Sequence, residues 1–369
     1  MRANLVLALG LLAASCTSSP IRSPFDPERF AFADEELVEF EGGGVVETVP
    51  GTWISYPVVA TRPFDRALVS WNVDLAPGAG YEVELRVRPD GESWSPWFFL
   101  DAYGTVPEET RGARRSESSA GRVDVDEFFA ARPERAAQVR FRLHGPARVR
   151  RVSLSLRETG ERFADAAQPR VLLAPSTAFA LAPLVVPALS QFDAAPEIAP
   201  RLCTPTSLAM VLRGAGIETD PETVARRTFD PLHDLYGNWP RAIQTAYGFG
   251  LEGRAAHLSG LGDLVPWLAG GHPVICSIAF AEGELPGAPI ASTDGHLLVV
   301  RGFTAAGDVL VADPAAPDAS KVLGTYPRAE FERAWLGHGG VALLFGEPVL
   351  PEPVKTLPSA PDPGEPGGG

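Results

Sequence analysis

The chain has 369 residues, of which 45% are hydrophobic and 21% charged, and its formal net charge is -14. Since a single hydrophobic core stops growing at about 250–300 residues, this length predicts two domains. The negative charge and the absence of any basic run argue against a protein that binds nucleic acid through its phosphate backbone.

Residues 1–15 have the pattern of a secretion signal rather than of a folded element. Arg2 supplies a positive start, and the apolar stretch 5–12 is too short to span a bilayer as a mature helix. Small residues precede Cys16, as in the lipobox of bacterial lipoproteins. We therefore expect cleavage before Cys16, a lipid on its thiol that holds the exported protein to a membrane of the bacterial cell envelope, and a tether over residues 16–29. Plain secretion with an incidental Cys16 is the alternative.

Residues 30–158 contain several short stretches in which apolar and polar side chains alternate, which is the period of a strand with one buried face. The apolar members are Tyr81, Val83, Leu85, Val87, Val139, Phe141, Leu143, Val152, Leu154 and Leu156. Turn residues at 77–80 and 89–91 separate the stretches, and no long helical period occurs. The pattern predicts an antiparallel β-sandwich accessory domain, jelly-roll-like in topology.

Three aromatic residues of this region, Trp94, Trp97 and Tyr103, lie close to its turns. Aromatic rings near loops stack on sugar rings, and aromatic side chains of strands also pack in cores. These three residues are candidate ligand-binding residues, with a carbohydrate or a cell-wall component as the ligand. The alternative roles for the domain are a spacer and a lid over a neighbouring cleft.

Residues 159–185 are rich in Ala and Pro and are predicted to be a linker, and the Pro/Gly-rich residues 347–369 are predicted to be a disordered tail. Between them, residues 186–346 mix helical and strand periods. The predicted helices are 203–213, 221–228, 240–247 and 261–268, and the predicted strands are 273–280, 296–303, 309–313 and 340–345. Helices followed by a meander of strands indicate an α+β domain.

Cys203 begins the first of these helices. Unpaired backbone N–H groups and the positive end of the helix dipole favour a thiolate at this position, and the thiolate is the nucleophilic form of cysteine. A buried packing residue is the alternative for Cys203, and a disulfide with Cys276 would abolish the nucleophile. Cys276 lies in the middle of a predicted strand and is expected in the core.

His296 opens a predicted apolar strand after Gly295, and Asp313 closes the next strand before Pro314. A strand end holds a side chain rigidly, as a general base requires, and the tight turn between the strands would place Asp313 beside the imidazole. An acid there fixes the imidazole tautomer and stabilises the imidazolium. Together with Cys203, these residues predict a nucleophile, a base and an orienting acid.

The other histidines are weaker candidates for the base. His338 lies in a Gly-rich loop and is the alternative to His296. His272 is a turn residue, and neither His233 nor His257 stands at a predicted strand end. No Cys-x-x-Cys pair and no His-x-x-x-His spacing occurs, which disfavours zinc, and the expected chemistry needs no metal or cofactor.

The segments CTPTS at 203–207, Gly295-His296 and VADP at 311–314 resemble the papain-like peptidases related to the domains that process double-glycine leader peptides. The resemblance covers nearly all of the second domain and implies a papain-like cysteine peptidase fold with a peptide or protein substrate. It also implies that Gln191, upstream of the cysteine, helps to form the oxyanion hole. Thr204 stands where the family commonly has Gly, and no transporter-like segment follows, so a free-standing envelope form is expected.

The function expected from the sequence is a lipid-anchored thiol peptidase of the cell envelope. Cys203 would attack the peptide carbonyl, His296 would move the proton, Asp313 would orient His296, and Gln191 would bind the oxyanion. Two alternatives stand beside it. One is a non-catalytic envelope binding protein with an inactive peptidase-like fold, and the other is a related amidase or transglutaminase-like acyl transferase.

Overall fold

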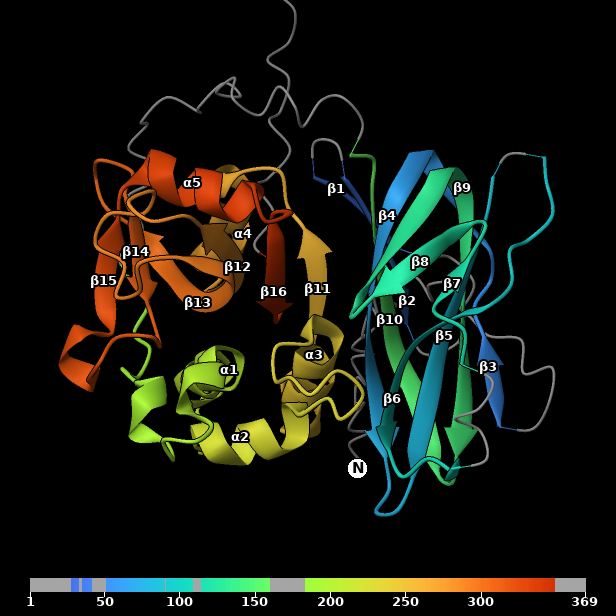
Figure 1. Cartoon of the computed structure of the whole chain (residues 1–369), viewed down its shortest axis with the longest axis horizontal. Helices are drawn as coiled ribbons and strands as arrows, with labels where there is room; N and C mark the ends of the chain where they lie inside the picture. The colour runs from blue at the N-terminus through green and yellow to red at the C-terminus, as the bar shows by residue number, and fades with distance from the viewer. Residues whose placement is uncertain are drawn as a thin grey trace, which may run out of the picture.

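The computed structural model describes residues 28–32, 35–41, 51–89, 91–108, 114–159 and 183–348. They form an all-β domain and a mixed domain of helices and strands, which lie side by side (Figure 1). The predicted signal peptide, Cys16, and nearly all of the predicted tether, linker and tail lie outside the described residues. No helix in the described part of the chain is long and apolar enough to cross a membrane.

The first domain is built from antiparallel strands in two packed layers. The strands are β1 (Glu28–Phe32), β2 (Glu35–Glu41), β3 (Thr52–Ile54), β4 (Val58–Leu75), β5 (Gly80–Arg88), β6 (Phe98–Gly104), β7 (Glu117–Ser118), β8 (Gly121–Asp124), β9 (Glu127–His144) and β10 (Ala147–Arg157). One layer has the order β1-β2-β10-β4 and the other β3-β9-β5-β6, and β4 and β9 also pair with each other where the layers meet. Trp71 of one layer packs edge-on against Tyr81 and Phe141 of the other, with ring centroids 6.1 and 6.0 Å away. The all-β domain predicted from the alternating pattern is therefore present.

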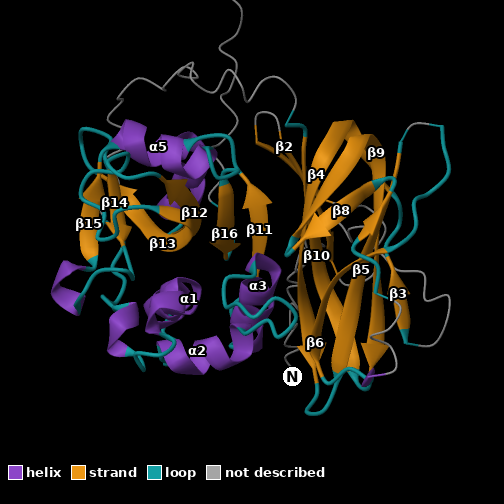
Figure 2. Cartoon of the chain, in the orientation of Figure 1, coloured by secondary structure: helices purple, strands orange, loops and turns teal. Residues whose placement is uncertain are grey.

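The second domain contains a six-stranded antiparallel sheet between two groups of helices (Figure 2). The helices are α1 (Cys203–Gly214), α2 (Pro221–Thr228), α3 (Trp239–Gly248), α4 (Val265–Ala269) and α5 (Arg328–Leu336). The strands are β11 (Gly253–His257), β12 (Val274–Phe280), β13 (Thr293–Phe303), β14 (Val309–Ala312), β15 (Leu323–Tyr326) and β16 (Val341–Phe345), in the spatial order β11-β16-β12-β13-β14-β15.

Alternate residues of β13 divide the core of this domain into two parts. Leu297 and Val299 pack with residues of α1, α2 and α3, whereas Leu298 and Val300 pack with residues of α4 and α5. The strand period of two thus supplies an apolar surface to both groups of helices. The predicted mixture of helices and antiparallel strands is confirmed.

Two predicted elements need correction. The helix predicted at 261–268 is a short 3-10 helix, Leu261–Leu264, followed by α4. The strand predicted to open at His296 opens at Thr293, because Thr293 already pairs with Phe280 of β12. His296 is therefore the fourth residue of β13 and not the first. In the second domain, the strands β11 and β15 and the helix α5 were not predicted.

Candidate active site

Cys203 is the first residue of α1, and it is partly exposed. No side chain caps this helix N-terminus, where the positive end of the helix dipole favours an anion. The helix is fixed against β13 by the Ser207 hydroxyl, which donates to the Leu297 carbonyl oxygen at 3.0 Å. This contact places Cys203 beside the strand that carries His296.

The Cys203 thiol has a pKa below its ordinary value. Burial, the largest influence, raises this pKa. The hydrogen bond and the charge of His296 lower it, as does a hydrogen bond from the Leu297 N–H, and together they outweigh burial. The geometry therefore favours a thiolate at Cys203 beside an imidazolium.

His296 and Asp313 form a buried hydrogen-bonded pair. Nε2 of His296 donates to Oδ1 of Asp313 at 2.8 Å. Burial, the largest influence on His296, lowers its pKa, but the Asp313 carboxylate and then Cys203 raise that pKa to about 10. Burial raises the pKa of Asp313, but the charge and the hydrogen bond of His296 bring it below the ordinary value. The pair thus holds a proton on the imidazole, as a partner for a thiolate requires.

Tyr326 is a further member of this group, and no pattern in the sequence indicates it. Its hydroxyl donates to Oδ2 of Asp313 at 2.5 Å, and the Ala315 N–H donates to Oδ1 at 2.9 Å. With His296, these donors occupy both carboxylate oxygens, so Asp313 is held in one orientation. Burial raises the pKa of Tyr326, and Asp313 raises it further, so the tyrosine remains a donor. Tyr326 lies on β15, whose short sequence LGTY carries no clear strand period.

Gln191 lies next to the loop that follows Asp313. It begins the 3-10 helix η4 (Gln191–Asp193), and its N–H donates to the Pro314 carbonyl oxygen at 2.8 Å. The preceding Ser190 hydroxyl donates to the Ala316 carbonyl oxygen at 2.6 Å. The Gln191 side chain is buried, and its Oε1 has no hydrogen-bond partner among the described residues. The same loop thus fixes the positions of Gln191 and Asp313.

Thr204, which replaces the glycine common in the resembling family, is fully buried. Its hydroxyl lies 3.6 Å from the point where a Cβ would stand at Gly237, and 3.9 Å from the Cys203 sulfur. The additional methyl and hydroxyl groups of Thr204 are therefore packed beneath the loop that precedes α3.

The alternative histidines have other partners. His338 is half-buried and lies near Gly295, but its ring packs edge-on against Trp239 at 6.2 Å, and burial lowers its pKa.

The remaining histidines lie away from Cys203. His233 contacts Asp230 at 2.8 Å. His257 lies between Ser155 and Glu127, His272 lies against Gly346, and neither position is beside Cys203. Of the histidines considered, the structure brings His296 to the thiol.

The second cysteine of this domain, Cys276, lies in the core. It is fully buried, and burial raises its pKa well above the ordinary value. Cys203 and Cys276 are both free thiols, so the disulfide considered from the sequence is absent between them. Among the described residues, no group of three His, Cys, Asp or Glu side chains could hold a metal ion.

The candidate ligand-binding aromatics of the first domain are packed against arginines. The Arg86 guanidinium lies 4.7 Å from the Trp94 ring centroid and 4.6 Å from that of Trp97. Arg88 also lies over Trp94, and Arg140 over Trp97. These cation–π contacts give both rings packing partners within the sandwich. A ligand-binding role for Trp94 and Trp97 stays a prediction.

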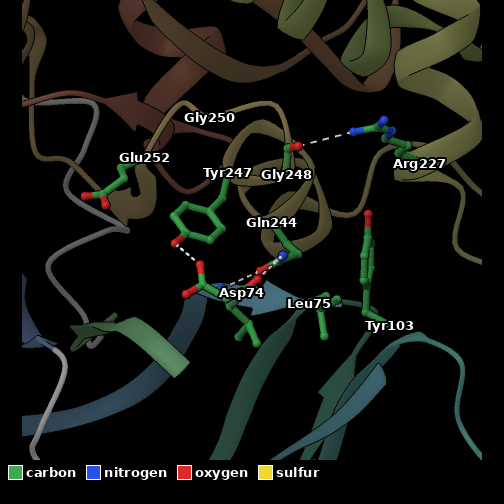
Figure 3. Close-up of a pocket in the computed structure, with 10 residues that line it drawn as sticks. Asp74, Leu75, Tyr103, Arg227, Gln244, Tyr247, Gly248, Gly250 and Glu252 are labelled. Carbon is green, nitrogen blue, oxygen red and sulfur yellow. Dashed lines mark hydrogen bonds between the residues drawn. The ribbon is translucent and has the colours of Figure 1, made fainter. Parts of the chain in front are cut away.

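Tyr103, the third aromatic candidate, stacks on Tyr81 at 5.9 Å, and the Arg241 guanidinium lies 5.4 Å from its ring centroid. It borders an open cavity of about 680 Å³ between the two domains. Figure 3 shows this cavity, which is lined by Val73, Asp74, Leu75, Tyr103, Arg227, Gln244, Tyr247, Gly248, Gly250 and Glu252. The residues around Cys203 do not line it.

Two family models match the chain. Residues 183–343 match the Peptidase_C39 like family, and residues 44–160 match the Peptidase C39 N-terminal domain. The match over the second domain supports a C39-related family of cysteine peptidases. The N-terminal model covers most of the β-sandwich, so both domains match models that are named for peptidases of this group.

Two solved structures are also similar to this chain. One is a double glycine motif protease from an AMS/PCAT transporter in complex with the leader peptide, with 22% identity over 45% of this chain and 94% of that chain, and a TM-score of 0.32. The other is a putative C39-like peptidase from Bacillus anthracis, with 20% identity over 45% of this chain and 97% of that chain, and a TM-score of 0.35. No curated protein matches the chain.

Proposed function

We propose that this protein is a thiol peptidase that hydrolyses peptide bonds with Cys203, His296 and Asp313 as its catalytic triad. One observation carries the proposal. A partly exposed cysteine at a helix N-terminus has a lowered pKa because it contacts an imidazole whose pKa Asp313 raises to about 10. A packing cysteine has no need of such partners.

The reaction follows from these positions. The Cys203 thiolate forms a bond to the peptide carbonyl carbon, and the carbonyl π electrons move to oxygen. The C–N bond then breaks as His296 gives its proton to the leaving amine, which leaves a thioester on Cys203. Water attacks the thioester, His296 accepts its proton, and the acid product leaves as the thiolate returns. Asp313 stabilises the imidazolium throughout.

The oxyanion of each tetrahedral intermediate requires hydrogen-bond donors. The Cys203 N–H at the start of α1 and the side-chain amide of Gln191 are our candidates for these donors. Support comes from the position of Gln191, whose buried segment is bonded to the loop after Asp313. This role completes a papain-like set of Cys, His, Asp and Gln residues.

The substrate and the location belong to the same proposal. A double glycine motif protease that is similar to this chain was solved with a leader peptide, which supports a peptide or protein substrate here. The small residues before Cys16 support a lipid anchor and a place in the bacterial cell envelope. The strand order β2-β10-β4 opposite β3-β9-β5-β6 supports a jelly-roll-like sandwich as the accessory domain.

The proposal is tested by the pH dependence of Cys203 alkylation with iodoacetamide, in a Cys276→Ala background. We expect an apparent pKa well below the ordinary thiol value of about 8.5, and a return toward that value in His296→Ala. Hydrolysis of a peptide library by the same protein, with Cys203→Ala as the control, then separates a peptidase from an acyl transferase that needs an amine acceptor. If Cys203 alkylates as an ordinary thiol, the peptidase proposal fails, and the alternative of a non-catalytic binding protein is favoured.

A further inference from the structure

The chain passes from the helices that carry Cys203 to the sheet that carries His296 through two consecutive elements, α3 and β11. α3 packs against α1, and β11 belongs to the same sheet as β13. Both elements face the β-sandwich (Figure 1). The position of α3 relative to β11 therefore affects the distance between the thiol and the imidazole.

The sandwich holds α3 by buried side chains. The Gln244 side-chain amide accepts from the Val73 N–H and donates to the Val73 carbonyl oxygen, both at 2.9 Å. One turn earlier, Arg241 donates to Asp101 at 2.7 Å, and both side chains are buried. A buried charge pair of this kind is costly to break, because either partner alone would remain buried and unpaired. α3 is thus fixed to the sandwich.

The sandwich also covers the free edge of β11. Strand edges expose unpaired backbone groups, which attract other strands. Here, side chains from β4 and β10 bond to the backbone of alternate β11 residues. The contacts are Asn72 with Gly253 at 3.1 Å, Ser70 with Ala255 at 2.9 Å, and Ser155 with His257 at 2.9 Å. β11 is thus fixed to the same sandwich as α3.

Two successive acids at the β8–β9 turn contact both elements at once. The Asp126 carboxyl group accepts from the Trp239 N–H, at the start of α3, at 2.9 Å. Glu127 accepts from Nε2 of His257, at the end of β11, at 3.0 Å. Because the two acids are adjacent in the chain, they fix the separation between the start of α3 and the end of β11.

These contacts continue to the neighbour of the catalytic base. The Trp239 ring meets the His338 ring edge-on at 6.2 Å. Nε2 of His338 lies 3.7 Å from the point where a Cβ would stand at Gly295. Gly295 directly precedes His296. A displacement of the Asp126 turn would therefore reach the start of the strand segment that holds the base.

From this arrangement we infer that Asp126 and Glu127 are positioning residues of the peptidase site, an inference that rests on the proposed function. Asp126 and Glu127 hold the helices that carry Cys203 in a fixed position relative to the sheet that carries His296, and we call this pair of contacts the clamp. The fixed position keeps the thiolate and the imidazolium in contact. On this view the sandwich is an integral part of the active peptidase rather than a detachable ligand-binding module.

The experiment compares full-length proteins in the Cys276→Ala background. The test variant is Asp126→Ala with Glu127→Ala, and each single variant is also made, in case the pair does not fold. We expect the folded variants to raise the apparent pKa of Cys203 by about one unit, which lowers its alkylation rate about tenfold at a pH below both values. Circular dichroism verifies that each protein is folded.

Two further variants separate positioning from a general loss of stability. Asp124→Ala lies on the same turn, but its side chain is exposed and pairs with Arg122, so it should behave as the wild type. Asp126→Asn with Glu127→Gln keeps both hydrogen-bond acceptors and should restore the low pKa of Cys203. An unchanged Cys203 profile in the folded alanine variants would overturn the positioning role.

A second measurement distinguishes this inference from the proposed function. If Cys203 of the wild type has an ordinary pKa, the peptidase proposal fails, and the clamp is judged by hydrogen exchange. Faster exchange of the Leu297 amide, which contacts Cys203, in the alanine variants but not in Asp124→Ala would support the clamp. Equal exchange in all of these proteins would overturn it.

Discussion

Two histidines of this molecule, both buried, stand between a hydroxyl or thiol group and a carboxylate, but we assign catalysis to only one of them. His296 contacts Cys203 and donates to Asp313 at 2.8 Å. His257 contacts the Ser155 hydroxyl at 3.2 Å and Glu127 at 3.0 Å. The acids are alike, since the pKa values of Asp313 and Glu127 both lie below the ordinary value: burial raises them, but the paired histidine outweighs it.

The difference between the two groups lies at the nucleophile. Cys203 is partly exposed at the start of a helix, where backbone N–H groups can bind an oxyanion. Ser155 lies within β10, is 1% exposed, and its hydroxyl accepts from the backbone N–H of His257. A nucleophile, a base and an acid in hydrogen-bond order therefore do not make an active site. Access for the substrate and donors for the oxyanion decide which group reacts.

Replacing Cys203 or Ser155 by alanine should give the largest difference in peptide hydrolysis between the two groups. Cys203→Ala should lower peptide hydrolysis about 10⁴-fold or more, because the triad acts as a unit. Ser155→Ala should change kcat/KM by less than about threefold. Ser155→Ala should lower the free energy of unfolding by about 1–3 kcal/mol, because the buried backbone N–H of His257 loses its acceptor. Hydrolysis assays and thermal unfolding of the two variants measure these effects.

Chemical labelling makes the same comparison without a substrate. Iodoacetamide should modify Cys203, whereas a serine-directed fluorophosphonate should leave Ser155 unmodified in the folded protein. Mass spectrometry of the intact protein and of its peptides reports both results. A phosphonylated Ser155 would contradict our view that His257 serves the domain interface alone.

Replacing the two acids should have a smaller effect, which also differs between the groups. In Asp313→Asn, the His296 pKa of about 10 should fall toward its ordinary value of about 6.5, since the carboxylate is the main influence that raises it. The thiolate and the imidazolium then coexist only up to a lower pH. The alkaline limb of kcat/KM should move to lower pH, and kcat/KM at pH 8 should fall about 10²-fold.

Glu127→Gln is the matched control for this change. It keeps an acceptor for Nε2 of His257 and removes one negative charge at the interface. The alkaline limb should stay in place, and kcat/KM should change by less than about tenfold. Full pH profiles of both variants separate the acid that we propose to be catalytic, Asp313, from the acid at the domain interface, Glu127. Equal shifts of the alkaline limb would remove the distinction between the two histidines.

The placement of Cys203, His296 and Asp313 could be predicted from the sequence, because its signals are local. Cys203 stands at the start of an apolar helical run, and Asp313 ends an apolar strand. These patterns place each residue on an element, and the short hairpin between β13 and β14 brings the strands of His296 and Asp313 together. Tyr326 could not be predicted, because β15 has four residues and its role depends on pairing with β14.

The structural half could not be predicted, because its partners lie far apart in the chain. β11, with the sequence GRAAH, has no alternating pattern, and all five residues are buried between two domains. The Glu127 contact to His257 spans 130 residues, and the Asn72 contact to Gly253 spans 181.

The smallest effect that we predict is at Asp126, beside the structural histidine group. Burial, the largest influence, raises the pKa of Asp126 to about 8, although the Trp239 N–H lowers it. An acid whose pKa is higher in the folded protein than in the unfolded chain, where it is about 3.9, binds its proton more tightly when folded. Its contribution to stability is complete below about pH 4 and is lost as the pH rises toward 8.

Asp126→Asn keeps the acceptor for the Trp239 N–H and removes this titration. The melting temperature of the variant relative to the wild type should therefore rise between pH 4.5 and pH 8, by several degrees. Asp124→Asn, on the exposed side of the same turn, should show no such trend. A wild type that gains stability relative to Asp126→Asn as the pH rises would mean that Asp126 is charged in the folded protein and that its charge stabilises the start of α3.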